Sequence, residues 1–251
     1  MNTEQSPEPA RVDSSPSKAL ARRDGGGAFF DRIAHRYDLL NRVMTFGVDG
    51  LWRRRLVRAL FSQGHVNSGD ELLDVATGTA DVAISTLRAY PQLSAVGLDP
   101  SAKMLAIGHE KLARAGLTER CEMIEGDAQA LPFDDGRFSA SCIAFGIRNV
   151  PDRLAGLREM ARVTRRGGRV VVLELSHPRK GLLAGAARFY IDRIIPRLGA
   201  WISGDSEYRY LAASIAAFPA PDAFSALMEQ AGLHMLEARR MHFGSVVLFV
   251  G

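Results

Sequence analysis

The chain has 251 residues, 47% of them hydrophobic, with a net charge of +4 and a pI near 9.3. This length and composition predict one α/β domain with a well-filled core. The balance is only mildly basic, without the patterned Lys and Arg excess of a dedicated nucleic-acid binder, so we expect no nucleic-acid partner, whereas an anionic membrane surface would be tolerated.

Residues 1–27 combine Ser, Pro and acidic residues with a glycine run and have no apolar block that could form the core of a signal peptide. We expect a disordered tail there and one folded domain over residues 28–251, with a cap over 28–65 and an inserted helical segment over 181–215. No stretch reaches the roughly 18 uninterrupted apolar residues that a spanning helix needs. A cytoplasmic protein is expected, with peripheral contact to the inner membrane as the alternative.

Apolar residues within 29–46 recur at steps of three and four, which predicts a helix with one apolar face in front of the sheet domain. Residues 51–60 repeat the pattern, with Trp52, Leu56 and Leu60 facing inward. We interpret the arginines of this second helix as a solvated face, with docking on a membrane surface as the alternative. These arginines are Arg53, Arg54, Arg55 and Arg58.

From residue 70 onward, short apolar runs alternate with helical patterns, which predicts a parallel sheet with helices on both faces. Two final strand-like runs, 233–240 and 245–250, form a hairpin after a helix that ends near Ala231, so one strand is antiparallel. The expected fold is α/β and Rossmann-like, with a mostly parallel seven-stranded sheet. The remaining strands are expected at about 70–76, 94–99, 121–126, 139–145 and 168–175, and further helices at about 80–90, 101–115 and 152–164.

Three acidic residues, Asp74, Asp99 and Asp127, stand where predicted strands end. In a doubly wound sheet the loops after successive strands converge on one crevice, so these residues predict a nucleoside pocket. Gly78 allows close approach of the backbone, and Thr79 offers a hydroxyl. Asp99 lies about 25 residues past Asp74, near the place of a carboxylate that accepts hydrogen bonds from a ribose diol.

The number of glycines in the turn indicates which nucleoside-containing ligand the pocket binds. A dinucleotide-binding turn has three glycines around a pyrophosphate, whereas only Gly78 is present here, so an NAD-dependent oxidoreductase is disfavoured. Asp74 and Asp81 flank the turn and suit a cationic ligand better than a diphosphate. S-adenosylmethionine is such a ligand. The alternative for Asp81 is an ordinary acid in the first turn of a helix.

Two further features have more ordinary interpretations. Cys121 and Cys142 fall on non-adjacent predicted strands, so we expect buried thiols and no disulfide. Residues 181–203 pair an apolar stripe with arginines, which we interpret as a half-buried helix with a solvated face. A helix that lies on lipid or covers an apolar substrate is the alternative. No metal-ligand spacing and no Ser/His/Asp nucleophile arrangement is evident, so we expect no metal.

Several motifs carry a family resemblance that runs from about residue 29 to the C-terminus. The chain resembles the quinone-ring C-methyltransferases of menaquinone and ubiquinone synthesis, a family of class I S-adenosylmethionine-dependent methyltransferases. The more specific motifs are Phe145-Gly146-Ile147-Arg148-Asn149-Val150 and Tyr208-Arg209-Tyr210-Leu211; Phe30-Asp31-Arg32-Ile33-Ala34 and Gly126-Asp127-Ala128 also match.

The resemblance implies cofactor contacts at Thr79, Asp99, Asp127 and Ala128, the last two against the adenine edge. To these we add Asp74 and Gly78 from the turn, and Tyr37 as a residue that closes over the cofactor, with hydrophobic packing as the alternative for Tyr37. The sequence departs from the family pattern at two positions: Ala80 stands where the turn usually has glycine, and Ala144 where many members have serine. Ala80 is strained if its φ must be positive.

The resemblance implies a hydroquinol substrate whose ring carbon accepts the methyl group. We assign Arg148 to stabilising a phenolate or polarising a water, because arginine does not lose its proton, with a structural ion pair as the alternative. Asn149 is expected to fix that water or a ring oxygen. Tyr208, Tyr210 and His177 are candidates for the substrate cavity, although a histidine such as His177 or His35 is more often a loop residue.

The expected reaction is methylation of demethylmenaquinol. The alternatives are methylation of the benzoquinol precursor of ubiquinone and a scaffold that binds the cofactor without turnover, motivated by Ala80 and Ala144. A nucleic-acid methyltransferase is disfavoured because the chain has no Asp-Pro-Pro-Tyr-like loop and no Pro-Cys pair. A homodimer is left open.

Overall fold

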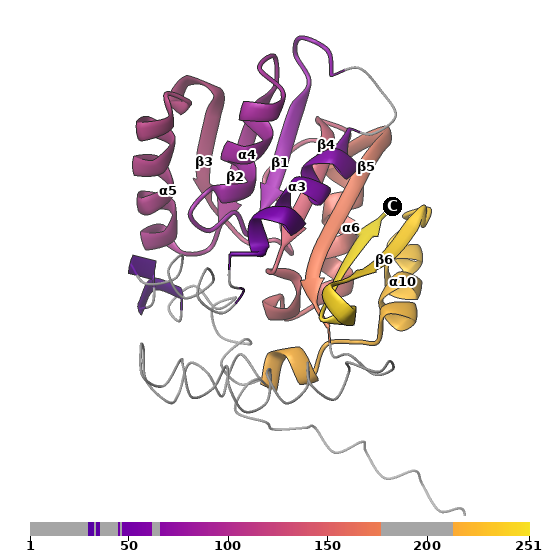
Figure 1. Ribbon diagram of the computed structural model, residues 1–251. Helices are drawn as coiled ribbons and strands as arrows, with labels where there is room; N and C mark the ends of the chain where they lie inside the picture. Colours follow the sequence, from indigo (N-terminus) through magenta and orange to yellow (C-terminus); the bar gives the residue numbers. More distant parts are fainter. Residues whose placement is uncertain (1–29, 33, 36–44, 46, 62–65, 177–212) are drawn as a thin grey trace, which may run out of the picture.

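The structure, a computed structural model, describes residues 30–32, 34–35, 45, 47–61, 66–176 and 213–251 (Figure 1). Its centre is one seven-stranded sheet in the order β3-β2-β1-β4-β5-β7-β6. The strands are β1 (Glu71–Val75), β2 (Ser94–Asp99), β3 (Cys121–Glu125), β4 (Phe138–Ala144), β5 (Thr164–Leu175), β6 (Glu237–Met241) and β7 (Val246–Val250).

The pairing confirms the expected fold class. β1 pairs in parallel with β2 and β4, whereas β7 runs antiparallel to both β5 and β6. β7 is therefore the single antiparallel strand, and the expected terminal hairpin is confirmed. The strand order reverses between β1 and β4, so the crevice at their carboxyl ends is where this class of sheet binds ligands.

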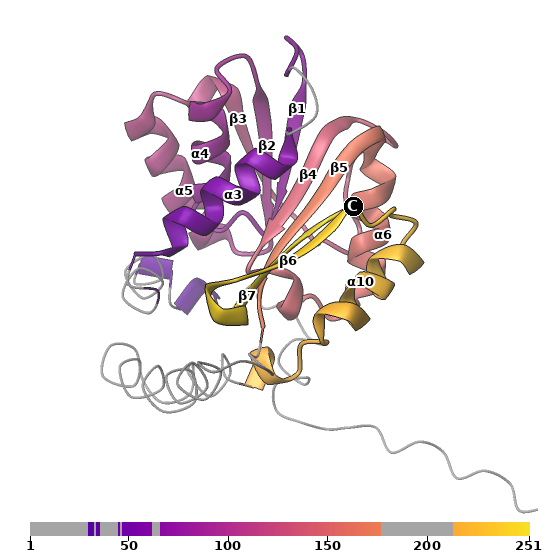
Figure 2. The same ribbon diagram turned by 45° about the vertical axis from the view of Figure 1, so that its right-hand side comes forward.

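Helices cover both faces of the sheet (Figure 2). α3 (Asp49–Leu60), α4 (Asp81–Ala89) and α5 (Ala102–Ala115) lie on one face, and α6 (Arg153–Val163) and α10 (Pro221–Gln230) lie on the other. Because both faces are covered, the central strands are apolar runs without alternation. Short 3₁₀ turns are η1 (Thr118–Arg120), η2 (Ile147–Asn149) and η4 (His242–Gly244).

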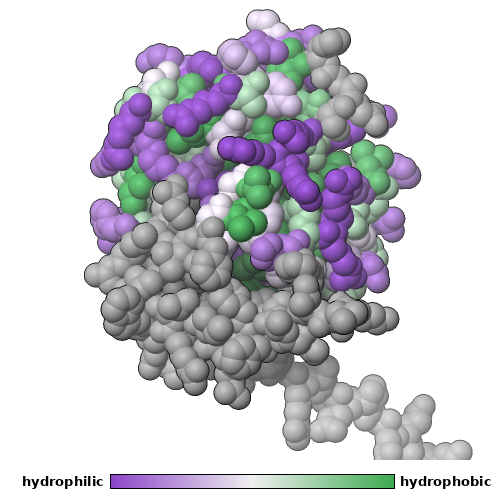
Figure 3. Space-filling view, viewed as in Figure 1, coloured by the Kyte–Doolittle hydropathy of each residue, from purple (hydrophilic) through white to green (hydrophobic). Residues whose placement is uncertain are grey.

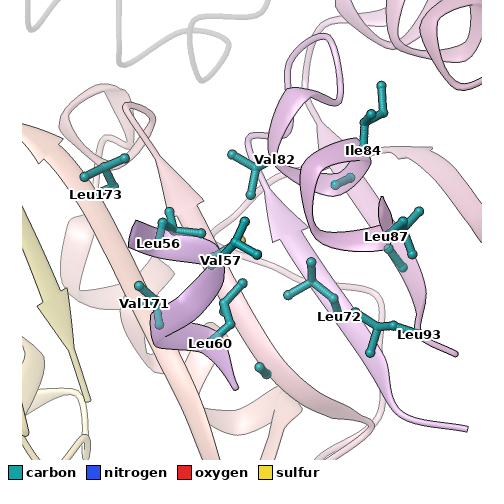
Figure 4. Close-up of a cluster of buried hydrophobic side chains, with 14 of the residues drawn as sticks. Leu56, Val57, Leu60, Leu72, Val82, Ile84, Leu87, Leu93, Val171 and Leu173 are labelled. Carbon is teal, nitrogen blue, oxygen red and sulfur yellow. The ribbon is translucent and has the colours of Figure 1, made fainter. Parts of the chain in front are cut away.

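The α3 helix confirms the periodicity of its segment. Trp52, Leu56 and Leu60 are buried, as expected, whereas Leu51 on the opposite face is 57% exposed. Figure 4 shows Leu56 and Leu60 in the same apolar cluster as residues of β5 and α4. Burying one such leucine contributes about 1.5–3 kcal/mol, so this face contributes strongly to the docking of α3 on the sheet.

Helix caps place two loops at the carboxyl edge. The Ser101 hydroxyl accepts from the Met104 amide at 3.2 Å at the start of α5, and the Asp152 carboxylate accepts from the Ala155 amide at 3.0 Å at the start of α6. Each cap satisfies an amide that the first helical turn leaves without a partner. The loops after β2 and β4 therefore leave the sheet at fixed points.

Other expectations are confirmed or lie outside the described residues. Cys121 and Cys142 are buried free thiols, as expected. β5 begins at Thr164, earlier than the expected 168, because its first residue pairs with Phe138 before a register shift. The tail over 1–27 and most of the inserted segment over 181–215 lie outside the described residues. Among the helices that the structure describes, none has the length and apolar character to cross a bilayer.

Candidate functional site

A cavity of about 60 Å³ opens at the carboxyl ends of β1, β2 and β4. This volume is smaller than the roughly 300–1,000 Å³ of a typical ligand pocket, so a nucleoside enters only if lining side chains move outward. The described lining of the cavity comes from the carboxyl ends of β1, β2, β3 and β4 with the segments that follow them, and from Phe30 of the N-terminal segment. The lining residues are Phe30, Ala76, Gly78, Leu98, Asp99, Pro100, Met104, Asp127, Ala128, Ala144, Phe145, Gly146, Asn149, Val150 and Pro151.

Asp99, at the end of β2, has the geometry of a diol acceptor. Its carboxylate accepts from the Gly78 amide at 2.8 Å and from the Ser101 amide at 2.9 Å, one bond on each oxygen. A carboxylate has about four acceptor positions, so two remain for a pair of hydroxyls. Burial raises the pKa of Asp99 to about 6, although these two amides oppose the shift. The residue is therefore mostly ionised at neutral pH.

Asp74 lies beneath the turn and is absent from the described cavity wall. Its carboxylate accepts from the Thr77 hydroxyl at 2.7 Å and the Ala83 amide at 3.2 Å, so it joins the end of β1 to the start of α4. Burial raises its pKa to about 6, against these hydrogen bonds and that from Cys142. In this geometry Asp74 shapes the turn that presents Gly78, and any effect on a cofactor passes through that turn.

Thr79 and Asp81 are held by cations of neighbouring helices. Lys111 donates to the Thr79 hydroxyl at 2.9 Å and also to the Asp81 carboxylate. Arg53 lies 2.5 Å from the other Asp81 oxygen. The negative charge of Asp81 is therefore neutralised within the protein. Among the described residues, the carboxylates in the cavity wall are those of Asp99 and Asp127, so the acidic character expected of the turn comes from later loops.

Asp127 and Ala128 follow β3 and lie in the cavity wall, as the nucleoside-pocket hypothesis requires. The exposed Asp127 carboxylate accepts from the Gln129 backbone amide at 2.9 Å and from the Gln129 side chain. Within the described part of the chain, no protein group accepts a hydrogen bond from the Ala128 amide. A carboxylate and a backbone N–H thus stand together, which is the pair that an adenine edge requires.

The loop after β4 forms the opposite wall. Phe145 has φ +57, and Gly146 passes so close to Ala76 that a Cβ on it would lie 2.6 Å from the Ala76 Cβ. Asn149, at the end of η2, is 5% exposed and belongs to the lining. The close approach of the two loops fixes the width of the crevice, and it explains the glycine in the Phe-Gly-Ile-Arg-Asn motif.

Arg148 faces a protein partner. Its guanidinium lies 2.8 Å from the Glu174 carboxylate, with side chains 7% and 0% exposed, and it also donates to the Phe145 carbonyl. The Glu174 carboxylate accepts in addition from the Arg148 amide at 3.2 Å. The structural ion pair considered for Arg148 is thus present, and Arg148 is not among the described lining residues. A direct catalytic role for it stays a prediction that this geometry does not favour.

Strained backbone gathers at this site. Among the described non-glycine residues, Ala76, Ala80, Phe145 and His242 have positive φ, and the first three lie in or beside the crevice. Ala80 stands where the family turn usually has glycine, and it has φ +64 at the N-terminus of α4. A positive φ strains an alanine, so the backbone is strained at this position. Such strain persists where surrounding structure fixes it, and it concentrates at functional sites. Ala144 lies in the lining and presents a methyl group there.

Sequence reasoning missed Phe30, Asp31, Lys111 and Glu174 as contributors. The Asp31 carboxylate accepts from the Ser101 hydroxyl at 2.6 Å and so ties the N-terminal segment to the start of α5. Glu174 carried a detectable signal, because an acid inside the run Val170–Leu175 requires a buried partner. The partners of Asp31 and Lys111 are so distant in sequence that no local pattern predicts these contacts.

The remaining predicted site residues fall either outside or inside the described part of the chain. Tyr37, His177, Tyr208 and Tyr210 lie outside it, so their roles stay predictions. His35 is described and exposed. Within the described ranges no cluster of His, Cys, Asp and Glu could hold a metal ion.

The sheet order and the cavity at its switch point define a class I methyltransferase fold. A solved S-adenosylmethionine-dependent methyltransferase of Aquifex aeolicus shares it with a TM-score of 0.54 at 15% identity, covering 77% of this chain and 90% of that one. Phosphoethanolamine N-methyltransferase 2 of Haemonchus contortus, solved with S-adenosylmethionine, has a TM-score of 0.54 at 16% identity, covering 75% of this chain and 38% of that one. Identities this low show the fold alone.

The chain belongs to the ubiE/COQ5 methyltransferase family, whose model matches residues 21–251. The ubiquinone/menaquinone biosynthesis C-methyltransferase UbiE of Syntrophotalea carbinolica is 44% identical over 222 residues, which cover 88% of this chain and 91% of that protein. The demethylmenaquinone methyltransferase of Thermus thermophilus is 44% identical over 223 residues, covering 88% and 98%. The resemblance inferred from the motifs is confirmed, and the protein is a methyltransferase.

Proposed function

We propose that the protein transfers a methyl group from S-adenosylmethionine to a ring carbon of a polyprenylated quinol, with demethylmenaquinol as the acceptor and menaquinol as the product. Membership of the family supports S-adenosylmethionine as the donor. The names of the relatives from Syntrophotalea carbinolica and Thermus thermophilus support a quinol acceptor. The observation that carries the proposal is Asp99, whose two unused acceptor positions face a cavity lined otherwise mainly by apolar groups.

The cavity residues fit the donor chemically. Asp99 accepts the two ribose hydroxyls, Gly78 allows close approach at φ +57, and Asp127 with the Ala128 amide pairs with the adenine edge. When bound, S-adenosylmethionine would supply a methyl group on a positively charged sulfur: the ring carbon bonds to the methyl carbon as its bond to sulfur breaks, neutral S-adenosylhomocysteine leaves, and the ring carbon loses its proton to solvent. Carboxylates in a poorly hydrated crevice favour a cation over a diphosphate.

On the acceptor side, Asn149 is the polar residue that the β4 loop places in the cavity wall. Its amide can hydrogen-bond to a ring hydroxyl, either directly or through a water. Polarising that hydroxyl raises the nucleophilicity of the ring carbon. Arg148 acts through the loop: by binding Glu174 and the Phe145 carbonyl, it fixes the turn from which Asn149 projects. We therefore assign Asn149 to the acceptor and Arg148 to positioning.

Peripheral membrane contact belongs to the same proposal, because a polyprenylated acceptor partitions into a bilayer. A methyltransferase confined to the aqueous phase would meet such an acceptor rarely. The expected cytoplasmic location and a homodimer stay predictions.

An assay with methyl-labelled S-adenosylmethionine and reduced short-chain analogues of both acceptors tests the proposal. We expect label on the ring carbon of the demethylmenaquinol analogue, faster than on the benzoquinol analogue. Asn149→Ala should lower kcat by about 100-fold and leave adenosylhomocysteine binding nearly unchanged. Asn67→Ala, at an exposed position before β1, is the matched control.

The alternatives give different results in the same assay. Faster labelling of the benzoquinol analogue would assign the protein to ubiquinone synthesis. Tight binding of adenosylhomocysteine without label on either analogue would identify a scaffold without turnover.

A further inference from the structure

The α3 helix presents an exposed stripe opposite its buried face. Leu51, Arg54, Arg55 and Arg58 follow each other at steps of three, one and three, so they share one side of the helix. All four are exposed, with Leu51 at 57%. Arg53 is not part of this stripe, because it pairs with Asp81. The arginine cluster of the sequence therefore divides into one structural and three surface residues.

Two open grooves flank this stripe. One, of about 370 Å³, lies between α3 and the end of β6 and includes Leu51, Arg54 and His242. The other, of about 690 Å³, lies between α3 and the β5–β6 side of the sheet and includes Arg169 and Leu236. Arg55 and Arg58 line both, so the grooves form one continuous surface, here called the arginine face.

The arginine face is apolar as well as basic. Leu51 and Leu236, at 57% and 55% exposure, are the large hydrophobic side chains exposed within the described ranges, and each lies in one of the two grooves. In Figure 3, hydrophilic side chains lie beside hydrophobic ones over α3 and the neighbouring strands. Exposed leucines beside arginines are typical of surfaces that insert apolar groups at a lipid interface.

Its charge is strongly one-sided. The described lining of the two grooves contains the arginines of the stripe together with Arg169 and Arg239, and one acid, Glu237, which pairs with Arg239. Within the described part of the chain, Arg54, Arg55 and Arg58 form no ion pair. Their charges are therefore available to an anionic partner, in contrast to Arg53.

The arginine face is adjacent to the functional site. Trp52, which lines the smaller groove, packs against Phe145 with ring centroids 6.1 Å apart, and Phe145 lines the cofactor cavity. The contact between Trp52 and Phe145 thus joins the wall of the groove to the wall of the crevice. A partner on this face would lie next to the site of chemistry.

We propose that the arginine face docks the protein on an anionic phospholipid bilayer, with Arg54, Arg55 and Arg58 at the headgroups and Leu51 and Leu236 in the interface. The inference rests on the proposed function, since a polyprenylated acceptor resides in the bilayer. A nucleic acid is a poorer fit, because single strands need exposed aromatic side chains for stacking and Trp52 is only 6% exposed.

Vesicle flotation with the full chain tests the inference. We expect binding to vesicles of phosphatidylcholine mixed with phosphatidylglycerol, weaker binding to phosphatidylcholine alone, and a further loss as salt rises. The variant R54Q/R55Q/R58Q should bind the mixed vesicles on the order of 100-fold more weakly. L51S/L236S should bind severalfold more weakly.

The matched control is R88Q/R114Q/R158Q, which removes the same charge from exposed positions on α4, α5 and α6 and should bind nearly as the parent does. Equal binding by the two triple variants would overturn the inference, as would parent binding that ignores lipid charge. Binding to an RNA oligonucleotide is measured on the same proteins. If R54Q/R55Q/R58Q loses RNA binding while its vesicle binding stays that of the parent, the face belongs to nucleic acid instead.

Turnover of a short-chain quinol separates this inference from the proposed function. R54Q/R55Q/R58Q should methylate a water-soluble analogue at the parent rate and lose activity only on acceptor held in anionic vesicles. If the parent methylates no quinol yet floats as expected, the proposed function fails and the docking surface stands.

Discussion

The Arg148 guanidinium and the Glu174 carboxylate lie 2.8 Å apart where β4 and β5 end, and both side chains are almost fully withdrawn from solvent. The pair joins the loop after β4 to the strand beside it, and the same guanidinium bonds the Phe145 carbonyl at the positive-φ turn. A buried ion pair contributes little net stability when complete, but it becomes costly when one partner is removed.

Glu174→Gln should therefore lower the free energy of unfolding by about 3 kcal/mol, because it leaves the Arg148 charge buried without a partner. Gln keeps an oxygen for the backbone amides, so the double variant with Arg148→Met should recover part of that loss. Urea denaturation measures both. A loss of stability in Glu174→Gln that Arg148→Met does not reduce would show that the unpaired Arg148 charge is not its cause.

Asp99→Asn should weaken adenosylhomocysteine binding by about 10- to 100-fold, because a charged acceptor of two hydroxyls becomes a neutral one with a single accepting atom. In the parent, affinity should fall as pH drops below about 6, where the carboxyl of Asp99 gains its proton. Calorimetry between pH 5 and pH 8 should show this dependence in the parent and a flat profile in the variant. Asp134→Asn, at an exposed position, is the control.

Asp74→Asn should change how stability depends on pH. The native pKa of about 6 exceeds the ordinary value of 3.8, so the folded protein binds this proton more tightly than the unfolded chain does. This group therefore stabilises the fold as pH falls from about 6 to about 4 and destabilises it at higher pH. The stability of the variant relative to the parent should therefore rise by about 2 kcal/mol between pH 4 and pH 8, because the variant lacks this titration. Equal differences at pH 4 and pH 8 would contradict the assignment.

Gly146→Ala should reduce cofactor affinity at least tenfold and destabilise the fold by about 1–3 kcal/mol. The added Cβ would lie 2.6 Å from that of Ala76, so the two loops must separate and the crevice must change width. Gly50→Ala is the control of opposite sign: no atom lies within 4 Å of its Cβ, and alanine favours the helix by about 0.5–1 kcal/mol. Thermal unfolding and calorimetry on both variants measure these effects.

Lys111→Met should weaken cofactor binding severalfold, because Lys111 holds the Thr79 hydroxyl and neutralises Asp81 beside the turn. Arg114→Ala is the control on the same helix, since its ion pair with Glu110 has side chains 73% and 67% exposed and should contribute well under about 1 kcal/mol. Indistinguishable affinities in the two variants would show that the turn does not depend on Lys111.

Much of the fold followed from periodicity. The apolar runs of β1 and β2 and the helical spacing of α3 predicted their elements to within two residues, because burial on one or both faces imposes the pattern directly on the sequence. The final hairpin was also predicted, from two strand-like runs, although its first strand begins at Glu237 and not at residue 233. The motifs around Gly146 and Asp127 predicted the family that the comparison confirmed.

At the candidate site the sequence predicted the acidic strand ends, but only the tertiary structure decided their orientation. Asp99 faces the cavity, whereas Asp74 lies beneath the turn and Asp81 is paired with cations from α3 and α5. Likewise, Arg148 meets Glu174, which lies 26 positions away. Local sequence determines which groups stand at a strand end. Where each side chain points depends on the sign of φ at the turn and on charges from elements distant in the chain, which meet only when the sheet is assembled.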